Sequence, residues 1–145
     1  MKPPSPPPFP QVFFISAGIC SLLGWNAVLT ALDFYSKYFP SFNVSFYMPI
    51  PKFIGHVIAL ILIFELAKRI SERKRVVENL IIQSILFVAL PFTALTNNEY
   101  FGFMLGLVLI FIYGFLNSLL QGTLIGLTSR FPAICTSLFW TGSGK

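Results

Sequence analysis

The chain has 145 residues, of which 55% are hydrophobic and only 10% are charged, and its net charge is +5. An ordinary soluble domain carries about 25% charged residues, so this composition excludes a soluble globular domain, whose surface must meet water. Five of the ten basic residues fall within residues 68–75, between two apolar segments; this clustering orients membrane proteins and does not indicate nucleic-acid binding. We therefore predict an all-α integral membrane protein, a polytopic helical bundle surrounded by the lipid bilayer.

Six of the eleven prolines lie in residues 1–10, which we predict to be an extended cytoplasmic tail, because proline-rich segments favour the polyproline conformation. The transmembrane domain is predicted over 11–145. Its first helix is expected at 11–32, since this segment contains no charged residue and about 20 apolar residues cross the hydrocarbon core. After a polar and aromatic connector, further helices are expected at 47–67, 76–95 and 102–129, with a partial helix at 133–145.

The distribution of basic residues predicts how these helices are oriented. With the N-terminus in the cytoplasm, the inner side collects seven basic residues and the outer side only Lys37 and Lys52. Cytoplasmic loops are enriched in Lys and Arg, so we predict a multi-pass protein with a cytoplasmic N-terminus, in the plasma membrane or an internal membrane. The outer connector carries the sequon Asn43-Val44-Ser45, which makes Asn43 a candidate glycosylation site, although the short loop holds it close to the membrane.

Polar side chains inside apolar helices need partners, and two groups of them are candidates for a site. In the first helix Asn26 lies beside Trp25, a pair that either tethers neighbouring helices or forms an aromatic wall with a hydrogen-bonding edge. In the fourth helix Asn117 and Gln121 are one turn apart, and a carboxamide offers both a donor and an acceptor. The same helix contains two GxxxG pairs, which let backbones approach closely and predict helix packing at Gly102, Gly106, Gly122 and Gly126.

The sequence contains no pattern typical of a catalytic, metal or cofactor site. Cys20 and Cys135 lie in apolar segments without a neighbouring His or Cys, so neither a disulfide framework nor a metal site is expected. Residues 142–145 (GSGK) lack the upstream glycine and the following Ser or Thr of a phosphate-binding loop. We predict that the chain is not an enzyme and uses no cofactor.

Two motifs together resemble a known family. Residues 24–35 (GWNAVLTALDFY) resemble the PWN-x-x-(I/L)TA-x-x-(Y/F) signature of the equilibrative nucleoside transporter family, with Gly24 in place of the proline. Residues 117–127 (NSLLQGTLIGL), followed by Phe131-Pro132, resemble its Q-G-(S/T)-x-x-G-L and L-P pattern, and residues 142–144 look like the G-x-G that follows. The order and spacing of these motifs agree over residues 11–144.

The resemblance implies a carrier of eleven helices with a major-facilitator-like fold, which moves nucleosides and sometimes nucleobases by facilitated diffusion through alternating access. It implies that Trp25 lines the central cavity, that Gln121 contacts the base and that Asn26 supports the shape of the site. The chain is then expected to be the N-terminal part of such a carrier, with the missing C-terminal part or a full-length homologue as partner. Two alternatives stay open: a non-transporting membrane subunit, and a small four-helix exporter acting as an oligomer.

Overall fold

The computed structural model of the protein describes residues 8–144, leaving aside the side chains of residues 8–10 and Ala67. Residues 1–7, which hold most of the predicted proline-rich tail, and Lys145 lie outside the described part. The regular secondary structure of that part is all helical, with the elements α1 (Pro8–Thr30), α2 (Leu32–Tyr38), α3 (Val44–Tyr47), α4 (Pro49–Arg69), α5 (Glu72–Phe92), the 3₁₀ turn η1 (Thr93–Leu95), α6 (Glu99–Thr128) and α7 (Ala133–Gly142).

Four helical segments of the described chain are long and apolar enough to cross a membrane, at Gln11–Tyr38, Val44–Leu66, Glu72–Leu95 and Glu99–Thr128. This confirms the prediction of an all-helical chain with four candidate membrane-spanning helices. The longest, α6, has 30 residues, which gives a length of about 45 Å at 1.5 Å per residue. Since the hydrocarbon core is about 30 Å thick, a helix of this length that spans a bilayer tilts or extends beyond the core.

The first apolar segment stays helical further than predicted, with one interruption at Ala31. The Thr30 hydroxyl donates to the Asn26 carbonyl oxygen, 2.7 Å away, and a hydrogen bond of this kind competes with the helix backbone and bends helices. The predicted connector begins with the helix α2 because two of its aromatic side chains, Tyr35 and Phe39, are buried in the core.

The basic residues predicted to form a loop are mostly helical. Only Ile70 and Ser71 separate α4 from α5, and α5 begins at Glu72 instead of at the predicted residue 76. Ser71 has the extended conformation typical of the residue before a helix (φ −61°, ψ 146°). Glu72 places a negative charge in the first helical turn, where the helix dipole favours it.

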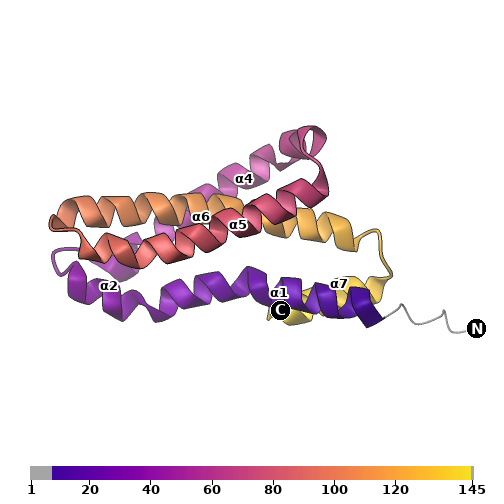
Figure 1. The fold of residues 1–145 in the computed structure, drawn as a ribbon, viewed down its shortest axis with the longest axis horizontal. Coiled ribbons are helices and arrows are strands. Elements are labelled where there is room, and N and C mark those ends of the chain that lie inside the picture. The colour runs from indigo at the N-terminus through magenta and orange to yellow at the C-terminus, as the bar shows by residue number, and fades with distance from the viewer. Residues whose placement is uncertain (1–7, 145) are drawn as a thin grey trace, which may run out of the picture.

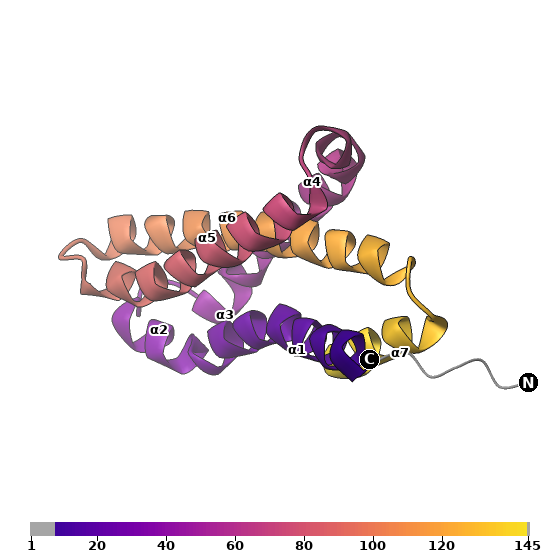
Figure 2. The same ribbon diagram turned by 45° about the vertical axis from the view of Figure 1, so that its right-hand side comes forward.

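The long helix α6 lies at the centre of the bundle. Figures 1 and 2 show α4 and α5 packed along α6, while α1 runs on another side with α7 beside its N-terminal half. The chain alternates in direction, so the start of α1, the turn between α4 and α5, and the end of α6 all lie at the same end of the molecule (Figure 1). Six basic residues are thereby collected at this end, namely Lys68, Arg69, Arg73, Lys74, Arg75 and Arg130.

Two buried clusters hold the helices together. The larger joins α1, α2, α3, α5, η1 and α6, together with Met48 just before α4, through Val28, Tyr35, Phe39, Val44, Met48, Leu90, Ala94, Phe103 and Ile110. The smaller joins α1, α6 and α7 through Phe14, Leu120, Leu124, Cys135 and Phe139. Many other large apolar side chains face outward; Ile61 and Phe64 of α4 are 70% and 75% exposed, as expected of a helix surrounded by lipid.

Candidate functional site

Trp25 lies where α1 meets α4 and is partly buried against the larger core cluster. The Lys52 ammonium of α4 lies over the indole ring, 3.7 Å from a ring centroid, well within the range of about 6 Å for a cation–π contact. Among residues 8–144 Lys52 has no carboxylate within salt-bridge distance. A cation from a neighbouring helix thus covers the aromatic face that the resemblance assigns to the substrate.

Gly24 determines how closely α1 approaches α5 and α6. A Cβ atom added at Gly24 would lie 2.8 Å from the Tyr113 hydroxyl and closer still to the Phe87 ring. These two rings pack edge to face, with centroids 5.0 Å apart, so they leave no room for a side chain. Packing therefore explains why glycine stands where the resembling signature has proline.

Asn117 and Gln121 lie one turn apart on α6. Asn117 is only 5% exposed, and its Oδ1 has no hydrogen-bond partner in the described part of the chain. Gln121 is partly buried. It stands between Leu120, which lines a hollow toward α1, and Gly122, which packs against Ile63 of α4. Both carboxamides therefore belong to the sector of α6 that faces α1 and α4.

Trp25 and Gln121 lie at different levels of the bundle. The Lys52 backbone contacts Gly114 of α6, and its side chain reaches Trp25. Gln121 follows Gly114 by seven residues, or about 10 Å along α6 at 1.5 Å per residue. Asn117 follows Gly114 by three residues, or about 4.5 Å. The unpaired oxygen of Asn117 therefore lies between the levels of the indole and of the second carboxamide.

Asn26, the third residue of the predicted site, is exposed on the outer surface of α1. Its backbone carbonyl accepts the Thr30 hydroxyl. The structure therefore does not bring Asn26 together with Asn117 and Gln121. An exposed carboxamide in the middle of an apolar helix needs a polar partner when lipid surrounds the helix.

The four glycines predicted to pack helices have different surroundings. Gly102 lies against the Thr93 carbonyl at the start of α6, and Gly122 lies against the Ile63 side chain. A Cβ at Gly106 would make only an ordinary contact, 3.6 Å from the Thr93 hydroxyl, and one at Gly126 would have nothing within 4 Å. Gly126 therefore has no packing partner within residues 8–144.

The closest helix crossings use two glycine pairs that the GxxxG pattern does not mark. At the crossing of α4 and α6, a Cβ added to Gly55 would lie 2.9 Å from the Phe115 backbone nitrogen. A Cβ added to Gly114 would lie 2.8 Å from the Lys52 Cα. At the contact of α1 and α7, a Cβ on Gly18 or on Gly142 would lie 2.9 or 3.2 Å from opposing backbone atoms. The sequence signal for the first pair is the even spacing of glycines along α6, at Gly106, Gly114 and Gly122.

A buried polar pair that the sequence analysis missed connects α5 to α6. Asn79 Nδ2 donates to the Leu116 carbonyl oxygen at 2.8 Å, and Gln83 Nε2 donates to Asn79 Oδ1 at 2.5 Å. Both side chains are buried. Two amides four residues apart in an apolar helix lie on one face, and this spacing was the signal available.

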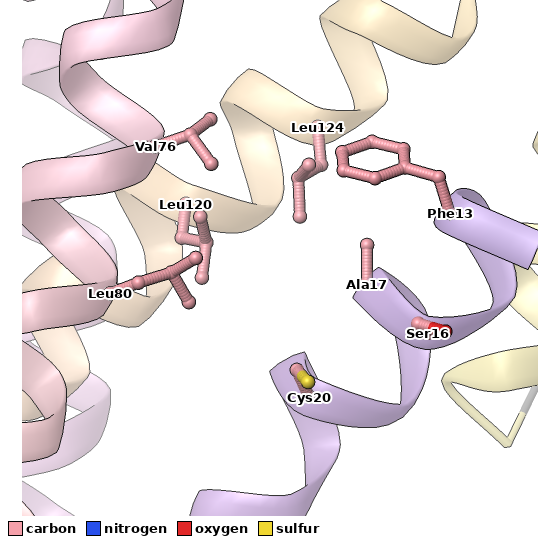
Figure 3. A pocket seen from close by; sticks show the side chains of 8 residues that line it. All are labelled: Phe13, Ser16, Ala17, Cys20, Val76, Leu80, Leu120 and Leu124. Carbon is pink, nitrogen blue, oxygen red and sulfur yellow. The ribbon is translucent and has the colours of Figure 1, made fainter. Parts of the chain in front are cut away.

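An apolar hollow of about 180 Å³ separates α1 from α5 and α6. Figure 3 shows its lining side chains, which are Phe13, Ser16, Ala17 and Cys20 from α1, Val76 and Leu80 from α5, and Leu120 and Leu124 from α6. Only one hydroxyl and one thiol are polar. Because binding sites for polar solutes need several well-placed donors and acceptors, this hollow is a poor site for such a solute.

Asn43, the candidate glycosylation site, is exposed in the turn before α3. Its backbone carbonyl accepts from the amides of Phe46 and Tyr47. The helix α4 starts close by and runs away from it, so Asn43 and the basic turn between α4 and α5 lie at opposite ends of the bundle. Glycosylation stays a prediction.

The helices α1, α4 and α6 contribute an aromatic face, an ammonium group and two carboxamides to one sector of the bundle. Aromatic faces stack on flat solutes, and carboxamides donate and accept hydrogen bonds. Comparison with protein families, with curated proteins and with solved structures finds no match to the chain.

Proposed function

We propose that the chain forms the substrate-contacting part of a membrane carrier for nucleosides, which acts by facilitated diffusion and alternating access in a major-facilitator-like fold. The resemblance of its two motifs to equilibrative nucleoside transporters suggests this function. The observation that carries the proposal is the buried oxygen of Asn117, which lacks a hydrogen-bond partner and lies between the levels of Trp25 and Gln121.

The Asn117 oxygen supports a permeant that carries hydrogen-bond donors. A buried polar atom without a partner costs about 1–3 kcal/mol, so an apolar residue here would make the empty bundle more stable. A permeant that donates an N–H or O–H to this oxygen removes the cost while it is bound. Nucleosides carry such donors on both the base and the ribose.

The indole of Trp25 supports a flat permeant that binds weakly. Stacking of a base on an aromatic side chain contributes about 1–3 kcal/mol. The Lys52 ammonium lies over the face of the same ring, and a cation–π contact contributes about 0.5–2 kcal/mol. A base that replaces the ammonium therefore gains little net free energy. Weak binding suits a carrier, which must release its substrate on the other side of the membrane.

The test is uptake of radiolabelled uridine and adenosine by cells that express the complete product of the gene. Asn117→Leu is expected to lower uptake about tenfold or more, because the permeant loses a buried hydrogen bond that nothing replaces. Trp25→Ala and Gln121→Ala are expected to lower it as well. Asn97→Leu is the matched control, since Asn97 is exposed in the turn before α6. Wild-type cells without uptake, or uptake unchanged in all three variants, would contradict the proposal.

The exposed carboxamide of Asn26 favours a second candidate function, that of a non-transporting membrane subunit paired with a homologous carrier. A photo-crosslinking residue placed at position 26 would then capture a larger homologue in native membranes. The control places the same photo-crosslinking residue at position 23, where the wild type has the exposed but apolar Leu23. It tests whether capture of the homologue depends on the position in α1. Capture of lipid alone at both positions would contradict the subunit function.

A further inference from the structure

A second hollow lies between α4, α6 and the start of α5, at the end of the bundle that holds six basic residues. The two helices touch at Gly55 and Gly114 and separate toward this end, as Figures 1 and 2 show. The hollow measures about 470 Å³. Gly126 of α6 forms part of its floor and has nothing within 4 Å of an added Cβ, while Ile63 and Phe64 of α4 form an apolar wall.

Two arginines stand at the rim of this hollow. Arg130 donates to both carboxylate oxygens of Glu72, at 3.1 and 2.5 Å, so these two charges compensate each other. Arg75 also lines the hollow, and its Nε is buried without a hydrogen-bond partner in the described part. Among the described residues the rim therefore offers one guanidinium without a carboxylate partner, and its buried Nε is a donor left unpaired.

The surrounding surface is also short of negative charge. Its three carboxylates, Glu65, Glu72 and Glu78, each form an ion pair with one cation. Within residues 8–144 the remaining basic side chains of this end have no carboxylate within 4 Å, and they are Arg69, Arg73 and Arg75. An anion at the rim is attracted by all three.

We propose that this hollow is a binding site for an anionic phospholipid, with the headgroup phosphate on Arg75 and one acyl chain against Gly126, Ile63 and Phe64. The apolar wall and the cationic rim match the two halves of such a lipid. Arginine binds phosphate oxygens through a planar array of donors, and basic pockets between membrane helices bind anionic headgroups. This site is separate from the proposed permeation site, and the proposal does not depend on it.

Other occupants fit the two halves of the hollow less well. A free phosphate uses only the guanidinium and leaves the apolar wall uncovered. A zwitterionic lipid fills the apolar part but brings no net negative charge to Arg75. A further protein helix could cover the glycine floor, yet it would have to bring a buried acidic residue to the rim.

Native mass spectrometry of the purified protein in detergent, with added phosphatidylglycerol or phosphatidylcholine of identical acyl chains, tests the proposal. The wild type is expected to retain one phosphatidylglycerol with about tenfold preference or more, which corresponds to a charge-assisted hydrogen bond. Arg75→Gln should abolish this preference. Gly126→Leu fills the floor without changing any charge, and it should prevent retention of the lipid.

Arg73→Gln is the matched control, because it removes the same charge at the same end from a residue that does not line this hollow. A diffuse attraction predicts an equal loss for both arginine variants, roughly fivefold for each charge, and that result would overturn the proposal. Retention of lipid by Gly126→Leu would overturn it as well, as would a wild type that carries a second protein chain and no lipid. Tryptophan fluorescence, compared with that of the wild type, shows that each variant is folded.

Discussion

The crossing of α4 and α6 gives the sharpest test of the fold, through the substitution Gly114→Ala. The added Cβ would lie 2.8 Å from the Lys52 Cα and closer still to the Lys52 carbonyl oxygen, whereas ordinary contact begins at 3.4 Å. Both opposing atoms belong to the backbone, so no side chain can rotate away. The two helices must therefore move apart by more than half an ångström along their contact.

The change in stability caused by Gly114→Ala follows from two opposing effects. Overpacking of a well-packed contact costs about 1–3 kcal/mol, while alanine improves helix propensity over glycine by up to about 1 kcal/mol. We expect Gly114→Ala to destabilise the protein by about 1–2 kcal/mol. Gly126→Ala on the same helix is the matched control, because its Cβ would meet nothing within 4 Å. It should leave stability unchanged or raise it by up to about 1 kcal/mol.

The assay is unfolding by sodium dodecyl sulfate in mixed micelles, followed by the fluorescence of Trp25 in a Trp140→Phe background. Trp25 packs against the larger core cluster, which includes residues of α1 and α6, and Lys52 of α4 lies over its ring, so its emission reports the separation of these helices. Equal stability of Gly114→Ala and Gly126→Ala would refute the close crossing of α4 and α6.

Three further substitutions test single contacts in the same assay. Lys52→Met should change the emission of Trp25 before any unfolding and destabilise the protein by about 0.5–2 kcal/mol, the range of a cation–π contact; an unchanged spectrum would mean that the ammonium does not lie over the ring. Asn79→Ala removes the buried link from α5 to α6 and should cost about 0.5–2 kcal/mol, and full stability would show that the link is not formed. Arg130→Gln breaks a largely exposed ion pair with Glu72, so its cost should stay below about 1 kcal/mol; a larger loss would indicate a buried network.

The sequence predicts the four long apolar helices well, because the number of apolar residues needed to cross a bilayer, about 20, follows directly from its thickness. Helix ends are predicted less well. The α5 helix starts at Glu72, since charged residues such as Arg73 can extend a helix into the interfacial region, where charge carries little cost. The continuation after Ala31 escaped prediction because it depends on the burial of Tyr35 by other helices.

The candidate site is only partly readable from the sequence. Trp25, Asn117 and Gln121 stand out as polar or amphipathic groups in apolar helices. The contact of Lys52 with Trp25 could not be predicted, because it depends on which face α4 turns toward α1. The same holds for the glycine pairs: Gly55 has no GxxxG partner, and its close approach to Gly114 follows from where the two helix axes cross. Contacts between residues far apart in the sequence can be assigned only when the three-dimensional arrangement of the helices is known.

The contact of α1 with α7 bears on the order in which the protein is made. Translation delivers α1 to the membrane first, while Gly142, the partner of Gly18, leaves the ribosome only after all four long helices have been synthesised. During that interval the face of α1 around Gly18, which packs against the α7 backbone in the folded state, has no such partner. A membrane insertase or chaperone that shields α1 until α7 arrives would therefore raise the yield of folded protein.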